Sequence, residues 1–308
     1  MRALLAVVTV VAACTGQPIA DSAWSEHAPM GVARSEHPAV VLDGELVVVG
    51  GFVEPAPGRT AVTASVETYD LDTDTWRALA DLPDPRHHAM ATVVDGRLYA
   101  LGGFSSAGFE ATDTVWELSD AGWEQRAPIP SPVAAGAAVT VDGSIYLVGG
   151  APAGGLLRYE PEGDRWVSLT SPQETREHLA AVVLDGEIWA IAGRWRGEIF
   201  SSTEIYDPGS DSWRPGPSLV QPRSGFGATT FNDTIAVAGG EVFGPDESLD
   251  SMELLADGSW RLGEALPFGI HGNPLVFVPH RLYLPGGSTR AGGVDNPGTL
   301  FSLPVREP

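Results

Sequence analysis

The sequence predicts an all-β protein that forms one closed array of short antiparallel units. A tryptophan followed 26 residues later by two small residues occurs six times, at a period of about 47 residues, which is typical of a repeat architecture. The 37 Gly and 25 Pro among 308 residues suit many short strands joined by turns. The six tryptophans are Trp24, Trp76, Trp123, Trp166, Trp213 and Trp260, and the doublets that follow them are Gly50-Gly51, Gly102-Gly103, Gly149-Gly150, Ala192-Gly193, Gly239-Gly240 and Gly286-Gly287.

Each unit has the pattern of an antiparallel meander. Two apolar runs flank a turn such as Asp43-Gly44, Asp95-Gly96, Asp142-Gly143 or Asp185-Gly186. This dipeptide favours a two-residue hairpin, because a type I′ turn needs positive φ at both central residues. The second run ends at the doublet, and a variable loop, a third strand and an acidic turn lead to the next tryptophan. We expect the tryptophans to have a structural role, packing between neighbouring units.

The same units resemble the kelch-repeat family, whose repeat carries an arginine at its start, a Gly-Gly doublet, a Tyr-Asp pair and a spaced tryptophan. The Tyr-Asp pair stands at Tyr69-Asp70 and Tyr206-Asp207. The resemblance spans residues 24–305 and implies a six-bladed kelch-type β-propeller. The sequence departs from this repeat in three ways, which affect only local turn geometry. Ala192 replaces the first glycine of the fourth doublet, Val133 and Ile270 replace the repeat arginine, and Pro279-His280 replaces the last Asp-Gly turn.

The order of the motifs predicts how the ring closes. The first tryptophan precedes the first doublet, and no tryptophan follows the last doublet. We therefore expect an N-terminal strand begun by Trp24 to complete the last blade. Such closure protects strand edges from aggregation.

The N-terminus resembles the signal sequence of a bacterial lipoprotein. Residues 1–13 have a short positive start and an apolar run that ends in small residues before Cys14, the only cysteine. We expect residues 1–13 to be removed, Cys14 to be lipidated and residues 14–23 to form a tether. The protein would then be exported and lipid-anchored to a bacterial membrane in the cell envelope. The alternative is a secreted or periplasmic protein.

The net negative charge of the chain indicates which kinds of partner it is expected to bind. Forty Asp and Glu against 18 basic residues, all arginine, give a net charge of −22. With no basic stripe to displace counterions, we expect no nucleic-acid partner. We also expect a monomer without a cofactor. Acidic turns such as Asp70, Asp72 and Asp74 are interpreted as solvated turns in preference to calcium sites, since no EF-hand spacing follows them.

Four repeat arginines are the first ligand-binding candidates. Because strand direction alternates, one face carries the arginine-bearing loops and the variable loops. Guanidinium groups gathered at the mouth of a central channel would favour a carboxylate, and the kelch resemblance implies peptide contacts at this position. The alternative is that these arginines brace neighbouring loops. The four are Arg34, Arg86, Arg176 and Arg223.

Further ligand-binding candidates share that face. Arg194, Trp195 and Arg196 follow the fourth doublet, and His88 and His178 stand two positions after a repeat arginine. The long loop from Phe52 to Ala64 is either a lid over the mouth or a disordered segment. A metal site built from His87, His88, His178 and His271 is conceivable, but we expect none.

Two functions remain open at this point. The first is a non-enzymatic binding module for a protein segment or glycan. The second is a carbohydrate-active enzyme similar to exported kelch proteins that epimerise or mutarotate sialic acid, which needs a carboxylate as general base. The candidate carboxylates are Glu36, Glu177 and Glu241, and no family motif assigns any of them a catalytic role.

Overall fold

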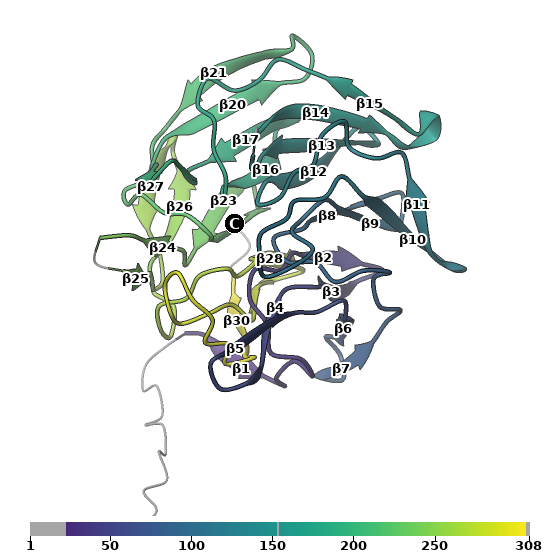
Figure 1. Ribbon diagram of the computed structural model, residues 1–308. Coiled ribbons are helices and arrows are strands. Elements are labelled where there is room, and N and C mark those ends of the chain that lie inside the picture. Colours follow the sequence, from purple (N-terminus) through teal and green to yellow (C-terminus); the bar gives the residue numbers. More distant parts are fainter. Residues whose placement is uncertain (1–22, 153, 245, 306–308) are drawn as a thin grey trace, which may run out of the picture.

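The computed structural model describes residues 23–152, 154–244 and 246–305. Six four-stranded antiparallel sheets surround a central axis, so the predicted six-bladed β-propeller is confirmed (Figure 1). The predicted leader, Cys14 and all but the last residue of the tether lie outside the described residues. Within those residues, no helix is long and apolar enough to cross a membrane.

The first three blades are formed by consecutive strands of the chain, except where a hairpin is inserted in the first. Within a blade, burial falls from the middle strands to the rim: β3 is almost fully buried, whereas β7 is mostly exposed. From axis to rim, these blades consist of β2 (Ala39–Leu42), β3 (Glu45–Val49), β6 (Val66–Asp70) and β7 (Thr75–Ala78); β8 (Met90–Val94), β9 (Arg97–Leu101), β10 (Val115–Ser119) and β11 (Gly122–Arg126); and β12 (Ala137–Val141), β13 (Ser144–Gly149), β14 (Gly155–Glu160) and β15 (Arg165–Ser168).

The other three blades repeat this order. They consist of β16 (Ala180–Leu184), β17 (Glu187–Ile191), β20 (Thr203–Asp207) and β21 (Ser212–Gly216); β22 (Gly227–Phe231), β23 (Thr234–Ala238), β26 (Met252–Ala256) and β27 (Ser259–Leu262); and β28 (Val276–Val278), β29 (Arg281–Pro285), β30 (Leu300–Pro304) and β1 (Ser25–His27). A 3-10 turn, η1 (Pro161–Gly163), and three hairpins complete the described structure: β4 (Phe52–Ala56) with β5 (Arg59–Val62), β18 (Arg194–Trp195) with β19 (Glu198–Ile199), and β24 (Glu241–Val242) with β25 (Glu247–Ser248).

The ring closes through the two ends of the chain, as predicted. Strand β1 pairs antiparallel with β30, with Ser25 opposite Ser302 and His27 opposite Leu300. Trp24, just before β1, is buried in a cluster with Ile270 and other apolar side chains of the last blades. The sixth blade therefore obtains its outer strand from the start of the propeller.

Five of the six repeat tryptophans join their blade to the preceding one through a hydrogen bond of the indole N–H. The indole Nε1 of Trp76 donates to the carbonyl of Ala28, and that of Trp166 donates to the carbonyl of Ala127. Trp123, Trp213 and Trp260 make the equivalent bond to the preceding blade. The expected structural role of these side chains is confirmed.

The acidic turns take part in the same joints. One carboxylate oxygen of Asp74 accepts hydrogen bonds from the hydroxyl of Tyr69 and from the backbone N–H of Ala28. Asp164 and Asp211 do the same in their blades. An aspartate engaged by two donors has a structural role, which agrees with the interpretation of these turns as turn chemistry.

The doublets and turns have the backbone that their residues predict. Asp43 and Gly44 both have positive φ, as a type I′ turn requires. Gly50 has φ +61°, and a Cβ there would lie 2.4 Å from the carbonyl oxygen of Arg86. Ala192, which replaces a doublet glycine, keeps the same backbone with φ 48°. The substitution in the fourth unit therefore leaves the turn intact.

Candidate functional site

Six backbone hydrogen bonds form a closed collar around the propeller axis. Each collar residue stands two positions after the repeat-arginine position, has φ between 50° and 60°, and donates its N–H to the carbonyl of its counterpart in the preceding blade. The N···O distances run from 2.7 to 2.9 Å. Four of the six collar residues are not glycine, although left-handed backbone is energetically costly for such residues. The collar hydrogen bonds hold these four residues in that conformation at the axis. The collar residues are Glu36, His88, Ala135, His178, Gly225 and Gly272.

Two cavities meet at the collar. The first, here called the mouth cavity, has a volume of about 450 Å³ and is lined by loop residues that include Phe52, Arg194, Glu241, His271 and Arg290. The second, of about 210 Å³, lies among the innermost strands and is lined largely by alanines. The collar side chains Glu36, His88 and His178 line both cavities, so they form the floor of the mouth cavity.

A second set of positions surrounds the mouth cavity. In every blade the residue just before the collar forms a β-bridge with the residue that follows the doublet. This bridge explains why residues 17 positions apart in sequence face each other at the mouth. The pairs are Ser35–Phe52, His87–Phe104, Ala134–Ala151, Glu177–Arg194, Ser224–Glu241 and His271–Ser288.

Arg194 links three polar groups on one side of the mouth cavity. Its guanidinium contacts Glu241 at 2.6 Å, Glu177 at 3.2 Å and Nε2 of His178 at 3.0 Å. Because a guanidinium only donates, His178 must accept on Nε2 and carry its proton on Nδ1. Glu241 is almost fully buried and also accepts the N–H of Gly292 at 2.7 Å.

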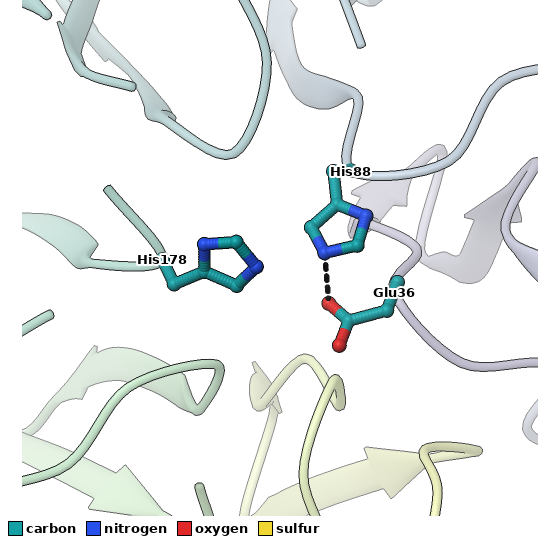
Figure 2. A group of neighbouring side chains, drawn as sticks. All are labelled: Glu36, His88 and His178. Carbon is teal, nitrogen blue, oxygen red and sulfur yellow. Dashed lines mark ion pairs between the residues drawn. The ribbon is translucent and has the colours of Figure 1, made fainter. Parts of the chain in front are cut away.

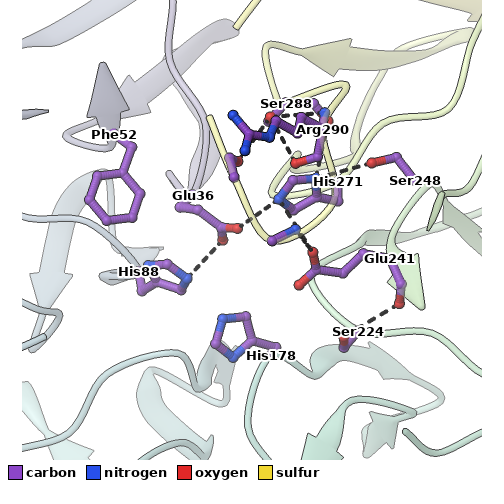
Figure 3. A network of polar contacts seen from close by, with 12 residues as sticks. Glu36, Phe52, His88, His178, Ser224, Glu241, Ser248, His271, Ser288 and Arg290 are labelled. Atoms are coloured by element: carbon purple, nitrogen blue, oxygen red, sulfur yellow. Dashed lines mark hydrogen bonds and ion pairs between the residues drawn. The ribbon is translucent and has the colours of Figure 1, made fainter. Parts of the chain in front are cut away.

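A hydrogen-bonded chain of His87, His88 and Glu36 determines where the proton between His88 and Glu36 lies. Nε2 of His87 donates to the carbonyl of Ser106, so its Nδ1 accepts from Nδ1 of His88 at 2.6 Å. Nε2 of His88 then holds a lone pair, 3.0 Å from a carboxyl oxygen of Glu36 (Figure 3). That contact needs a proton, and the carboxyl group of Glu36 supplies it.

The electrostatics agree with this assignment. Burial raises the pKa of Glu36 to about 8, and the nearby carboxylate of Glu241 adds to the rise. Burial lowers the pKa of His88 well below 6.5, and His178 lowers it further. At neutral pH, Glu36 is therefore protonated and His88 is neutral.

His271 connects the two carboxyl groups. Its Nδ1 lies 3.1 Å from the carbonyl of Ser288, and its Nε2 lies 3.5 Å from both Glu36 and Glu241 (Figure 3). His271 and Glu241 thus join the floor residues in one polar cluster of two carboxyl groups and three imidazoles.

Phenylalanine rings from the first, second and fifth blades form the aromatic wall of the mouth cavity. Phe52 stacks on His87 with ring centroids 3.7 Å apart, and Phe109 packs edge-on against both rings. Phe243 lies under the guanidinium of Arg194 at 4.9 Å. The loop from Phe52 to Ala64 contains the β4–β5 hairpin and lines the cavity, as the lid alternative predicts.

The repeat arginines are not at the channel mouth, and that prediction is corrected. The side chains of Arg34, Arg176 and Arg223 have 0% exposure. Their guanidinium groups bind backbone carbonyls and a glutamate of the same blade: Arg223, for example, bonds Gly239, Ser251 and Glu253. None of the three lines either cavity. The structure shows the alternative role, in which these arginines brace the loops.

Arg86 is buried as well, but its partners differ. It bonds the carbonyl of Pro85 and the hydroxyl of Thr114, because Trp116 stands where the other braced blades have glutamate. Arg86 also lies outside both cavities.

Sequence covariation within the chain confirms the bracing role. The glutamates Glu67, Glu204 and Glu253 also accept backbone N–H groups from the loop before the arginine. In the three blades without this glutamate, the residue three positions before the repeat-arginine position is proline, which lacks the N–H that Gln173 and Val220 donate to their glutamates. These prolines are Pro83, Pro130 and Pro267, and the residues that replace the glutamates are Trp116, Leu157 and Phe301.

The remaining predicted residues divide into two groups. Arg194, His88 and His178 meet at the mouth cavity together with the candidate carboxylates Glu36 and Glu241. Trp195 and Arg196 lie beside it: Arg196 covers the ring of Trp195 at 5.8 Å, and neither lines the cavity.

Sequence patterns did not predict three large side chains of the mouth cavity. Phe109, Phe243 and Arg290 belong to the variable loops that follow doublets. These loops differ in length from unit to unit, so repeat spacing carries no information on where their side chains point.

Comparisons with known proteins agree with the fold. The Kelch motif matches residues 33–83 and 175–220. Kelch-like protein 35 of Mus musculus is 32% identical over 218 residues, which cover 70% of this chain and 29% of that protein. Kelch-like protein terF of Aspergillus terreus is 28% identical over 221 residues, 68% of this chain and 40% of that protein. These matches support the kelch-repeat family.

A solved structure, "Structure of YjhT", superposes with a TM-score of 0.75 at 17% identity, covering 87% of this chain and 95% of that one. The protein is a six-bladed kelch propeller. Kelch propellers are generic protein-interaction modules. This kelch propeller spans 40% or less of the length of the curated relatives named above, so their whole-protein partners do not transfer to it directly.

The bracing role makes a testable prediction about stability. Glu253→Leu alone leaves the Arg223 cation buried without its carboxylate, and we expect it to destabilise the fold by about 3 to 5 kcal/mol. The triple change Glu253→Leu, Arg223→Val and Val220→Pro copies the third blade and should recover more than half of that loss. Urea denaturation of the variants measures both effects. Equal stability of the single and triple variants would contradict the pairing.

Proposed function

We propose that this kelch propeller is a binding module that takes an acidic residue of a protein segment, or an acidic sugar of a glycan, into the mouth cavity. The observation that carries the proposal is that the cavity combines Arg290, which has no ion-pair partner among the described residues, with exposed phenylalanine rings. Its volume of about 450 Å³ lies in the range of small-ligand sites.

Arg290 is the cation that we assign to the ligand. Its side chain lines the mouth cavity, and the described residues contain no ion pair with its guanidinium. Arg194 differs, because Glu177 and Glu241 already balance its charge. A carboxylate that enters the cavity therefore meets Arg290 as its charge partner, and a guanidinium binds carboxylates with two parallel hydrogen bonds.

The aromatic wall supplies the apolar contact. Phe109 is 55% exposed and Phe243 is 40% exposed, although both are large hydrophobic side chains. Aromatic surfaces beside polar groups suit sugar rings and the aliphatic parts of peptide side chains. The two features together favour a ligand with one acidic and one apolar face.

A binding screen tests this assignment. We expect an acidic peptide or an acidic sugar such as N-acetylneuraminate to bind in isothermal titration calorimetry, and a neutral sugar to bind more weakly. Arg290→Ala should weaken binding by about ten- to a hundred-fold, the loss typical of a charged hydrogen-bonded pair. Arg261→Ala, which removes an exposed arginine on the outer strand β27, is the matched control. Equal affinity of wild type and Arg290→Ala would refute the assignment.

The proton shared by Glu36 and His88 favours a second candidate, sugar epimerisation or mutarotation. In mutarotation, protonated Glu36 would donate to the ring oxygen while a carboxylate oxygen of Glu241 accepts the proton of the anomeric hydroxyl. The ring C–O bond breaks, the carbonyl carbon rotates, and reversal of both proton transfers closes the other anomer. A carboxylic acid kept neutral in a cavity is suited to this proton transfer.

Nuclear magnetic resonance of freshly dissolved N-acetylneuraminate tests the second candidate. We expect faster anomer exchange with the wild type and at least about a hundred-fold less acceleration with Glu36→Gln, since general acid catalysis contributes on that scale. Glu198→Gln, in the exposed strand β19, serves as the control. An exchange rate unchanged by wild-type protein would exclude this activity.

Export and lipid anchoring belong to the same proposal. The signal-like sequence before Cys14 supports them. We expect labelled palmitate to be incorporated into the protein in a bacterial host and to be lost in Cys14→Ser. Incorporation that survives this change would contradict lipidation at Cys14.

A further inference from the structure

Three side chains on the collar bring metal-binding atoms together. Glu36, His88 and His178 come from the first, second and fourth blades, and their ligand atoms all lie within 4.8 Å of one another. Figure 2 shows the three side chains directed toward one common space over the axis. This geometry was not foreseen in the sequence analysis, which expected no metal.

The protonation states leave lone pairs on two imidazole nitrogens that a metal ion can bind. The hydrogen bond from His88 to His87 places the lone pair of His88 on Nε2, next to Glu36. The contact of Arg194 with Nε2 of His178 shows that this nitrogen also holds its lone pair. Two imidazole lone pairs and one carboxyl oxygen thus face the same space.

Polar groups contact the Nδ1 atoms of His88 and His178 and orient both rings. Metal-binding histidines usually have such support. Nδ1 of His88 is held by His87, which is itself held by the carbonyl of Ser106. Nδ1 of His178 lies 3.5 Å from the carboxylate of Glu177. A carboxylate or carbonyl behind the far nitrogen of a histidine is the usual support of a metal-binding imidazole. The collar bonds fix the three backbones as well.

We propose that Glu36, His88 and His178 bind one divalent first-row transition-metal ion, such as Zn²⁺ or Co²⁺, at the floor of the mouth cavity. Two imidazoles and a carboxylate suit these ions and do not suit Ca²⁺ or Mg²⁺, which prefer oxygen ligands. Three protein ligands leave coordination positions open toward the cavity. On binding, the ion takes the place of the proton that Glu36 and His88 share.

Arg194 occupies one of the proposed ligand atoms. Its guanidinium occupies the lone pair of His178 at 3.0 Å and adds a positive charge beside the ion position. Glu177 and Glu241 remain as its partners when it releases His178. Arg194 and the metal therefore compete, and removal of Arg194 should strengthen metal binding.

The test uses protein without a histidine tag, from which metal has been removed with a chelator. Binding of ZnCl₂ is measured by calorimetric titration, and binding of CoCl₂ by visible absorption. We expect one equivalent of tight binding and the d–d bands of Co²⁺ bound to imidazole. His88→Ala and His178→Ala should each weaken binding by at least about tenfold. Arg194→Gln should strengthen it, and His280→Asn, in the β28–β29 turn, should leave it unchanged.

Thermal denaturation without metal shows whether each variant is folded, and Arg194→Gln tests the proposal by a gain that misfolding cannot produce. Absence of stoichiometric binding to the wild type would overturn the proposal. Binding that is equal in wild type, His88→Ala and His178→Ala would also overturn it. Since a metal bound to Glu36 removes its proton, tight metal binding would argue against the mutarotation candidate and leave ligand binding through Arg290 in place.

Discussion

The collar of six backbone hydrogen bonds is the constraint on which the functional site of this kelch propeller depends. Six residues from six blades donate to one another in a closed ring, so no blade can shift at the axis without breaking bonds on both sides. Four of these residues have a side chain on left-handed backbone. Such strain persists where the surrounding structure imposes it, and here it places two imidazoles and a carboxyl group over the axis.

The chain separates this site from the machinery that holds the blades together. Three of the four repeat arginines bind buried glutamates and backbone carbonyls, whereas the tryptophans and acidic turns join blades near the rim. The residues left to contact a ligand stand at the collar, at the bridge positions and in the variable loops. A site built on rigid repeat positions and completed by variable loops can change its ligand without altering the fold.

The sequence predicted the fold more fully than the site, for a physical reason. Spacing of tryptophans and doublets reports backbone geometry, which the repeat preserves, and therefore predicted six blades and their closure. An arginine at a repeat position has the same appearance in sequence whether it faces solvent or a buried glutamate such as Glu253. The pairing was visible only as covariation with prolines such as Pro130. Arg290 and Phe109 lie in loops without repeat spacing, and no sequence signal located them.

The central claim is that the mouth cavity above the collar is the functional site. A crystal structure of the protein with its best-binding acidic sugar or peptide tests this claim most directly. We predict ligand density in the mouth cavity, in contact with Arg290 and the aromatic wall, with Arg34, Arg176 and Arg223 still buried. A ligand bound on the opposite face, or one that draws a repeat arginine out of its glutamate pair, would contradict the account.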